Sequence, residues 1–207
     1  MKRAVTKICE FFFGPKVSVA RCWLFAGILL GFLMSEAQAQ SIQWRSATLT
    51  VVDDSWTTNA DFNIELSPRM EEVLGNGVAL YFVAELELTR PRWYWLDERV
   101  LSERLTMRLG YQPLLRQYRL SSGVLHRNFA SLSEALQELG RIRGWQVAER
   151  ERLKPGEPYK AFVRMRFDSS QLPRLMQVGP GAARDWNLQS DWQRFNLTTP
   201  ATESGSR

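Results

Sequence analysis

The sequence predicts a mainly β protein, an antiparallel β-sandwich of about eight strands with one amphipathic helix packed on it. Two observations lead to this fold class. Apolar and polar residues alternate along most of the chain after residue 40, as they do in strands that bury one face and expose the other. A strong helical repeat of apolar residues occurs in the segment 131–143. We therefore expect a single mostly-β domain over residues 40–197.

The expected strands follow one another with turn residues between them. The long segment 78–88 places every second residue on one continuous apolar face. A strand is expected to resume at 145–147, and the alternation along 186–192 predicts a closing strand in which Trp186 and Trp192 pack in the core. The remaining strands are expected at 46–51, 61–66, 101–109, 114–121 and 161–167.

Two segments carry helix signals. Ser67 and Pro68 open a short helix that Gly75 ends. The stronger helix begins at Ser131, which has the spacing of a capping box with Glu134. We expect Gly144 to end it. Its apolar stripe comprises Leu132, Ala135, Leu136, Leu139 and Ile142.

The first 39 residues have the order of a secretory signal peptide. A basic segment that ends at Arg21 precedes the uncharged apolar run 22–34 and an A-x-A cleavage pattern at 37–39. The apolar run is shorter than the roughly 20 residues of a membrane-spanning helix. We expect residues 1–39 to be removed on export to the periplasm; if they were retained, they would anchor the domain to the inner membrane. Residues 198–207 are small and polar and are expected to form a disordered tail.

Charge and cysteine content exclude several classes of protein. Residues 1–39 contain five basic and two acidic residues, so their removal lowers the formal net charge from +5 to +2. A nearly balanced domain gives no reason to expect a nucleic-acid partner. Both cysteines, Cys9 and Cys22, lie in the expected signal, which excludes a small disulfide-stapled scaffold. Arginine far outnumbers lysine after residue 40, which reflects either genomic base composition or the binding of an anionic surface.

The sequence shows no catalytic, cofactor-binding or metal-binding constellation. The single histidine, His126, is expected to be a structural or surface residue. The acidic pairs at 53–54, 71–72 and 97–98 lie at expected turns and helix starts, where solvated or capping roles dominate. We therefore expect a protein that is not an enzyme and needs no cofactor. A hydrolase that uses dispersed carboxylates is the alternative.

One segment between two long strands is the candidate interaction surface. It comprises Arg90, Arg92, Trp93, Tyr94 and Trp95, at an expected hairpin end. Aromatic residues flanked by arginines are typical of binding hot spots and of membrane-interface belts. The competing interpretation is that Trp93 and Trp95 share one face and fill the end of the core, with Tyr94 outside.

Several short motifs, taken together, resemble those of a known family. They are the sequences at 118–121, 129–132, 134–136, 143–145, 163–174 and 186–192. With the signal, the chain resembles an uncharacterised family of Gram-negative envelope proteins, catalogued as a domain of unknown function. The resemblance covers nearly all of the chain after residue 40 and implies no activity and no site residues. Genes of this family are often neighbours of a membrane-bound sensor kinase, which implies an accessory role in signalling.

These observations favour an exported, non-enzymatic binding or interaction domain of the cell envelope. Its expected partner is another envelope protein, and a membrane surface is a second partner class. Two alternatives remain besides the hydrolase. One is an accessory of a membrane-bound sensor kinase that keeps its N-terminal anchor. The other is a small outer-membrane β-barrel, whose strands also alternate between two faces.

Overall fold

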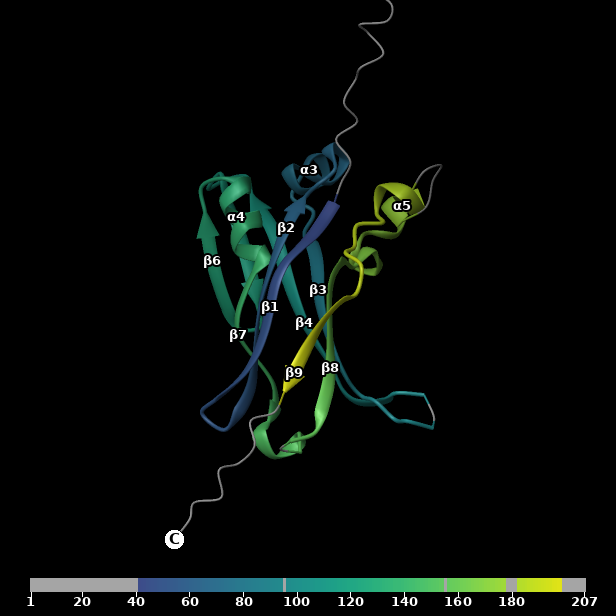
Figure 1. Cartoon of the computed structure of the whole chain (residues 1–207). Helices are drawn as coiled ribbons and strands as arrows, with labels where there is room; N and C mark the ends of the chain where they lie inside the picture. Colours follow the sequence, from purple (N-terminus) through teal and green to yellow (C-terminus); the bar gives the residue numbers. More distant parts are fainter. Residues whose placement is uncertain (1–40, 95, 155, 178–181, 199–207) are drawn as a thin grey trace, which may run out of the picture. The chain divides into compact units, whose positions relative to one another are not determined.

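The computed structural model describes residues 41–94, 96–154, 156–177 and 182–198. Within these residues the chain forms two antiparallel sheets (Figure 1). A three-stranded sheet has the order β1-β2-β7, and a six-stranded sheet has the order β6-β5-β4-β3-β8-β9. The predicted mainly β class with antiparallel strands is thus confirmed. The expected signal peptide and nearly all of the expected tail lie outside the described residues.

The elements have the following bounds. The strands are β1 (Ser41–Val52), β2 (Ser55–Glu65), β3 (Leu80–Arg90), β4 (Glu98–Gln112), β5 (Gln117–Ser122), β6 (Leu125–Phe129), β7 (Arg141–Glu149), β8 (Pro158–Phe167) and β9 (Gln193–Thr198). The helices are α3 (Pro68–Gly75), α4 (Leu132–Gly140), α5 (Arg174–Gln177) and α6 (Ala182–Asp185), with short 3-10 turns at Arg150–Arg152 and Ser169–Gln171. No helix among the described residues has both the length and the apolar character needed to cross a membrane.

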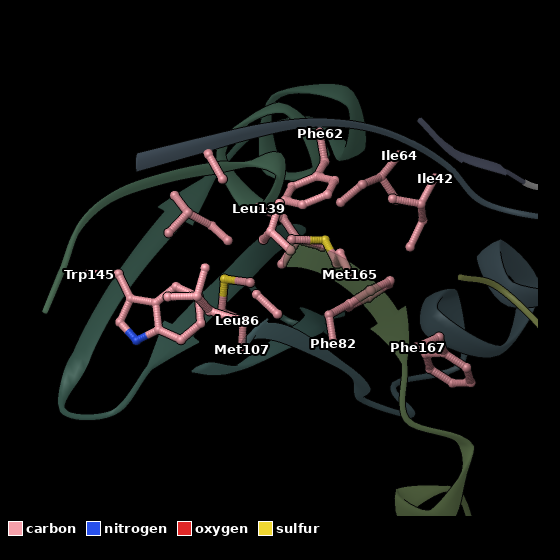
Figure 2. Packing of buried hydrophobic residues seen from close by; sticks show 14 of the residues in the cluster. Ile42, Phe62, Ile64, Phe82, Leu86, Met107, Leu139, Trp145, Met165 and Phe167 are labelled. Atoms are coloured by element: carbon pink, nitrogen blue, oxygen red, sulfur yellow. The ribbon is translucent and has the colours of Figure 1, made fainter. Parts of the chain in front are cut away.

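The hydrophobic core takes side chains from both sheets and from α4. Every second side chain of β3, from Leu80 to Leu88, is completely buried. These residues belong to one cluster with Phe62 of β2, Met165 of β8 and Leu139 of α4 (Figure 2). Burying one such side chain stabilises the fold by about 1.5–3 kcal/mol. The alternation that predicted strand 78–88 is therefore the pattern that fills the core.

Both predicted helices begin where their capping residues lie. The Ser67 hydroxyl accepts a hydrogen bond from the Met70 amide at 3.2 Å, and Pro68 follows as the first helical residue. The Ser131 hydroxyl accepts one from the Glu134 amide at 3.3 Å. Each bond satisfies a backbone donor that the first helical turn leaves without a partner.

The end of α4 differs from the prediction. The helix ends at Gly140, and β7 begins with the next residue, so Ile142 lies in a strand and not on the helix. A Cβ atom added to Gly140 would lie 2.1 Å from the Phe62 carbonyl oxygen. Arg141, with φ −99° and ψ 88°, is no longer helical, so α4 ends four residues before Gly144, at its close approach to β2. Gly144 has a φ of 63° and lies within β7, at an irregularity in its pairing with β2.

The closing strand also differs from the prediction. Residues 186–192 form one isolated bridge, from Gln189 to Arg166, and the regular ladder with β8 starts at Gln193. Trp186 is buried as expected, and its indole N–H donates to the Met176 carbonyl at 2.7 Å. Trp192 is 36% exposed, so its predicted core position is wrong.

Candidate functional site

The loop between β3 and β4 extends away from the strands that carry it (Figure 1). Residues 90–98 are named the arm below. Arg90 and Glu98 are register partners, so the ladder of β3 and β4 closes at the base of the arm. Trp95 lies outside the described residues. Of the predicted interaction surface, the structure therefore places Arg90, Arg92, Trp93 and Tyr94, and it brings all four into the arm.

Ion pairs brace the base of the arm against β4 and β8. The Arg90 guanidinium lies 2.5 Å from a Glu98 carboxylate oxygen and 3.0 Å from a Glu157 oxygen. Arg92 approaches the same Glu98 oxygen at 2.6 Å, and the Lys160 ammonium lies 2.7 Å from Asp97. These contacts tie the arm to the strands on both sides of it.

The charges at the base shift the pKa of the groups that they join. Hydrogen bonds from Arg90 and Arg92 lower the pKa of Glu98 below its ordinary value. The hydrogen bond from Arg90 lowers the pKa of Glu157 in the same way. Both carboxylates therefore stay ionised at neutral pH, and the ion pairs at the base persist under those conditions.

The tip of the arm is apolar and lies in solvent. Trp93 is 94% exposed, Tyr94 is 64% exposed and Leu96 is 81% exposed. The rings of Trp93 and Tyr94 contact each other edge-on, with centroids 5.0 Å apart. The interpretation in which Trp93 fills the end of the core is therefore wrong. Tryptophan and tyrosine beside arginine are the residue types that dominate binding energy in protein interfaces.

The predicted acidic pairs lie on separate elements. Asp53 and Asp54 form the turn between β1 and β2, with φ values of 46° and 60°. The pair at 71–72 lies on α3, and the pair at 97–98 takes part in the ion pairs of the arm. Among the described residues, no three His, Cys, Asp or Glu side chains are grouped as metal ligands. His126 is exposed on β6.

A second charged feature lies on the face of the six-stranded sheet that points away from the core. The Glu85 carboxylate of β3 is 6% exposed and accepts a hydrogen bond from Arg164 Nε at 2.6 Å and one from Arg166 Nε at 3.3 Å. Arg104 Nε lies 3.4 Å from the same carboxylate. These four residues are named the guanidinium cluster below. The sequence placed each of them on a strand but did not reveal that three strands bring them together.

Two opposing effects determine the pKa of Glu85. Burial raises it, whereas the hydrogen bond and charge of Arg164, followed by those of Arg166, lower it. The arginines prevail, and the pKa lies below its ordinary value of 4.5. Glu85 is therefore a carboxylate at neutral pH, and the guanidinium cluster retains an excess of positive charge.

The fold and these two surfaces define a mainly β domain with an exposed aromatic arm and an arginine-rich sheet face. The model of a family described as a domain of unknown function (DUF4390) matches residues 39–196. The chain belongs to this family, as the motifs at 118–192 led us to expect. No curated protein and no solved structure matches the chain.

Proposed function

We propose that the protein is an exported, non-enzymatic interaction module of the bacterial cell envelope that docks on another envelope protein through the arm. The main support for this proposal is that the arm combines a fixed base with an exposed apolar tip. Its base is fixed by ion pairs, while Trp93, Tyr94 and Leu96 at its tip are 94%, 64% and 81% exposed.

Exposed apolar side chains at a tip gain free energy when a partner covers them. A large aromatic residue buries about 150–250 Å² in an interface. The braced base lowers the entropy cost of binding, because the strands and ion pairs already restrict the conformations of the arm. An arm of this kind suits a partner with an apolar pocket that covers Trp93, Tyr94 and Leu96.

Export is the part of the proposal that rests on the sequence. Residues 1–39 have the basic, apolar and A-x-A order of a cleaved signal, and residues 41–198 contain no cysteine. We propose the periplasm as the compartment, with Gln40 as the first residue of the mature protein. If the segment is retained, the same domain faces the periplasm from an inner-membrane anchor.

Site-specific photo-crosslinking in producing cells tests the proposed docking. A photoreactive residue replaces Tyr94, and a control replaces Thr48, which is exposed on β1 of the other sheet. We expect one envelope protein to be captured at position 94 and not at position 48, because only the arm contacts the partner. Capture of the same proteins at both positions, or of none at position 94, would count against the proposal.

A further inference from the structure

The outer face of the six-stranded sheet concentrates positive charge. Outward residues of β3 lie beside outward residues of β4 and β8 in register, as Glu85 does beside Arg104 and Arg164. The same alternation continues to β5 and β9. The basic residues on this face are Arg99, Arg104, Arg108, Arg119, Lys160, Arg164, Arg166 and Arg194, and the acidic residues are Glu85 and Glu87. Asp97 and Asp168 pair with Lys160 and Arg166 at its margins.

The net positive charge of this face exceeds that of the whole domain, because its eight basic residues outnumber four acidic ones even when Asp97 and Asp168 are included. Residues 40–207 have a formal net charge of only +2 once the five basic and two acidic residues of 1–39 are removed. The surface outside this face therefore carries a net negative charge. Such a charge distribution orients a protein on a negatively charged surface.

The guanidinium cluster leaves donors available for an anion. Arg104, Arg164 and Arg166 all approach Glu85 through Nε. Among the described residues Arg104 pairs with Glu85 alone, and its side chain is 69% exposed. A guanidinium offers five N–H donors in a rigid plane that suits phosphate oxygens. Glu85 thus holds the arginines in place; Arg166 also approaches Asp168 at 3.7 Å, whereas the outer part of Arg104 lies in solvent, where it can bind an anion.

Two more exposed arginines and one aromatic residue complete the face. Arg108 lies over Gly110, whose Cβ position is 3.6 Å from its guanidinium, and Arg194 is exposed on β9. Neither forms an ion pair among the described residues. Trp192 stacks on Arg164, with the guanidinium carbon 4.4 Å from the ring centroid. Tryptophan beside arginine is typical of surfaces that lie at the lipid–water interface.

We propose that this face docks on the surface of an anionic lipid bilayer and binds lipid phosphate groups through its arginines. The charge extends from Arg119 on β5 to Arg194 on β9, five strands that span roughly 19 Å at about 4.8 Å per strand. A bilayer presents phosphates across that whole width, whereas one extended acidic peptide would cover a fraction of it. This inference is independent of the proposed function of the arm.

Vesicle partitioning with two matched triple variants tests the inference. The mature chain from Gln40, which lacks the basic and apolar segment 1–39 that would itself bind anionic vesicles, is mixed with vesicles of equal parts phosphatidylglycerol and phosphatidylcholine, or of phosphatidylcholine alone. The first variant is Arg104→Gln, Arg108→Gln and Arg194→Gln. The control removes the same charge elsewhere, by Arg45→Gln, Arg116→Gln and Arg152→Gln, all exposed. Since a basic residue near an anionic bilayer changes partitioning about fivefold, we expect the first variant to bind on the order of 100-fold more weakly.

We expect the first variant to lose binding to the anionic vesicles, and the control to change its binding by less than tenfold. The unmodified chain is expected to prefer the anionic vesicles. Equal losses for the two triples would overturn the proposal, as would equal binding to both vesicle types. If soluble polyglutamate bound through these arginines and vesicles did not, the face would bind an acidic polypeptide and the proposal of a bilayer would be wrong.

A second measurement needs no arginine variant. A photoreactive residue at Thr106, which lies between Arg104 and Arg108 on β4, is expected to form lipid adducts with the anionic vesicles. A photoreactive residue at Thr48 is not expected to form lipid adducts. Equal adduct yields at the two positions would overturn the proposal even if the triple variant failed to fold.

Discussion

Replacing Gly140 by alanine is expected to lower the free energy of unfolding by about 3 kcal/mol. The added Cβ would lie 2.1 Å from the Phe62 carbonyl oxygen and 3.1 Å from its carbonyl carbon. Both are backbone atoms of β2, so no side chain can rotate away to make room. Either α4 or β2 must shift, and the shift disturbs the packing of Leu139 and Phe62 in the core.

Chemical denaturation of the Gly140→Ala variant measures this effect. Gly75→Ala is the matched control, because Gly75 is also the last residue of a helix and its Cβ position has nothing within 4 Å. Alanine favours the helical conformation over glycine by about 0.8–1.0 kcal/mol, so the control is expected to be neutral or stabilising. If the Gly140 variant were as stable as the original chain, the close packing of α4 on β2 would be wrong.

Replacing Glu85 by glutamine is expected to lower the free energy of unfolding by about 3 kcal/mol. The carboxylate is 6% exposed and is the shared partner of Arg104, Arg164 and Arg166. Without its charge, three guanidiniums remain close together and repel one another. Glu87→Gln, on the same strand and face, is the control. Among the described residues Glu87 pairs with Arg99 alone, whose side chain is 64% exposed, and a pair of this kind contributes about 0–1 kcal/mol.

The effect of Glu85 on stability should depend on pH in a definite direction. Its pKa in the folded protein lies below the ordinary value of 4.5, so its stabilising contribution is complete above pH 4.5 and is lost as the pH falls through the lower folded value. The difference in unfolding free energy between the original chain and Glu85→Gln should therefore shrink in acid. A difference that stayed constant from pH 7 to below pH 4 would contradict the account of the guanidinium cluster.

Much of the fold is predictable from local patterns. The alternation along 78–88 and 161–167 correctly assigned strands, and the serines at 67 and 131 correctly marked helix starts. The end of α4 was not predictable, because it depends on the approach of Gly140 to a strand far away in the sequence. The alternation of 186–192 was misleading, since Trp186 packs beside Phe167 without a continuous ladder.

The two candidate sites also differ in how far they could be predicted from the sequence. The arm was recognisable because its arginines and aromatic residues lie close together in the sequence. Its exposure to solvent was not predictable, since the end of a strand can face core or solvent equally well. The guanidinium cluster was not recognisable, because Glu85, Arg104 and Arg164 are adjacent only through strand register. A single sequence indicates which residues share a face of a strand, but it does not indicate which strands pair.

The proposed docking requires that the tip of the arm is exposed in the isolated protein and covered in the cell. Tyr94→Cys introduces a thiol into residues 41–198, which contain no cysteine, and maleimide modification of that peptide can be followed by mass spectrometry. Thr48→Cys serves as the control. We predict rapid modification at position 94 in purified protein, at least tenfold slower modification in intact cells, and equal rates at position 48. Slow modification at position 94 in purified protein, or equal rates there in both settings, would contradict docking through the arm.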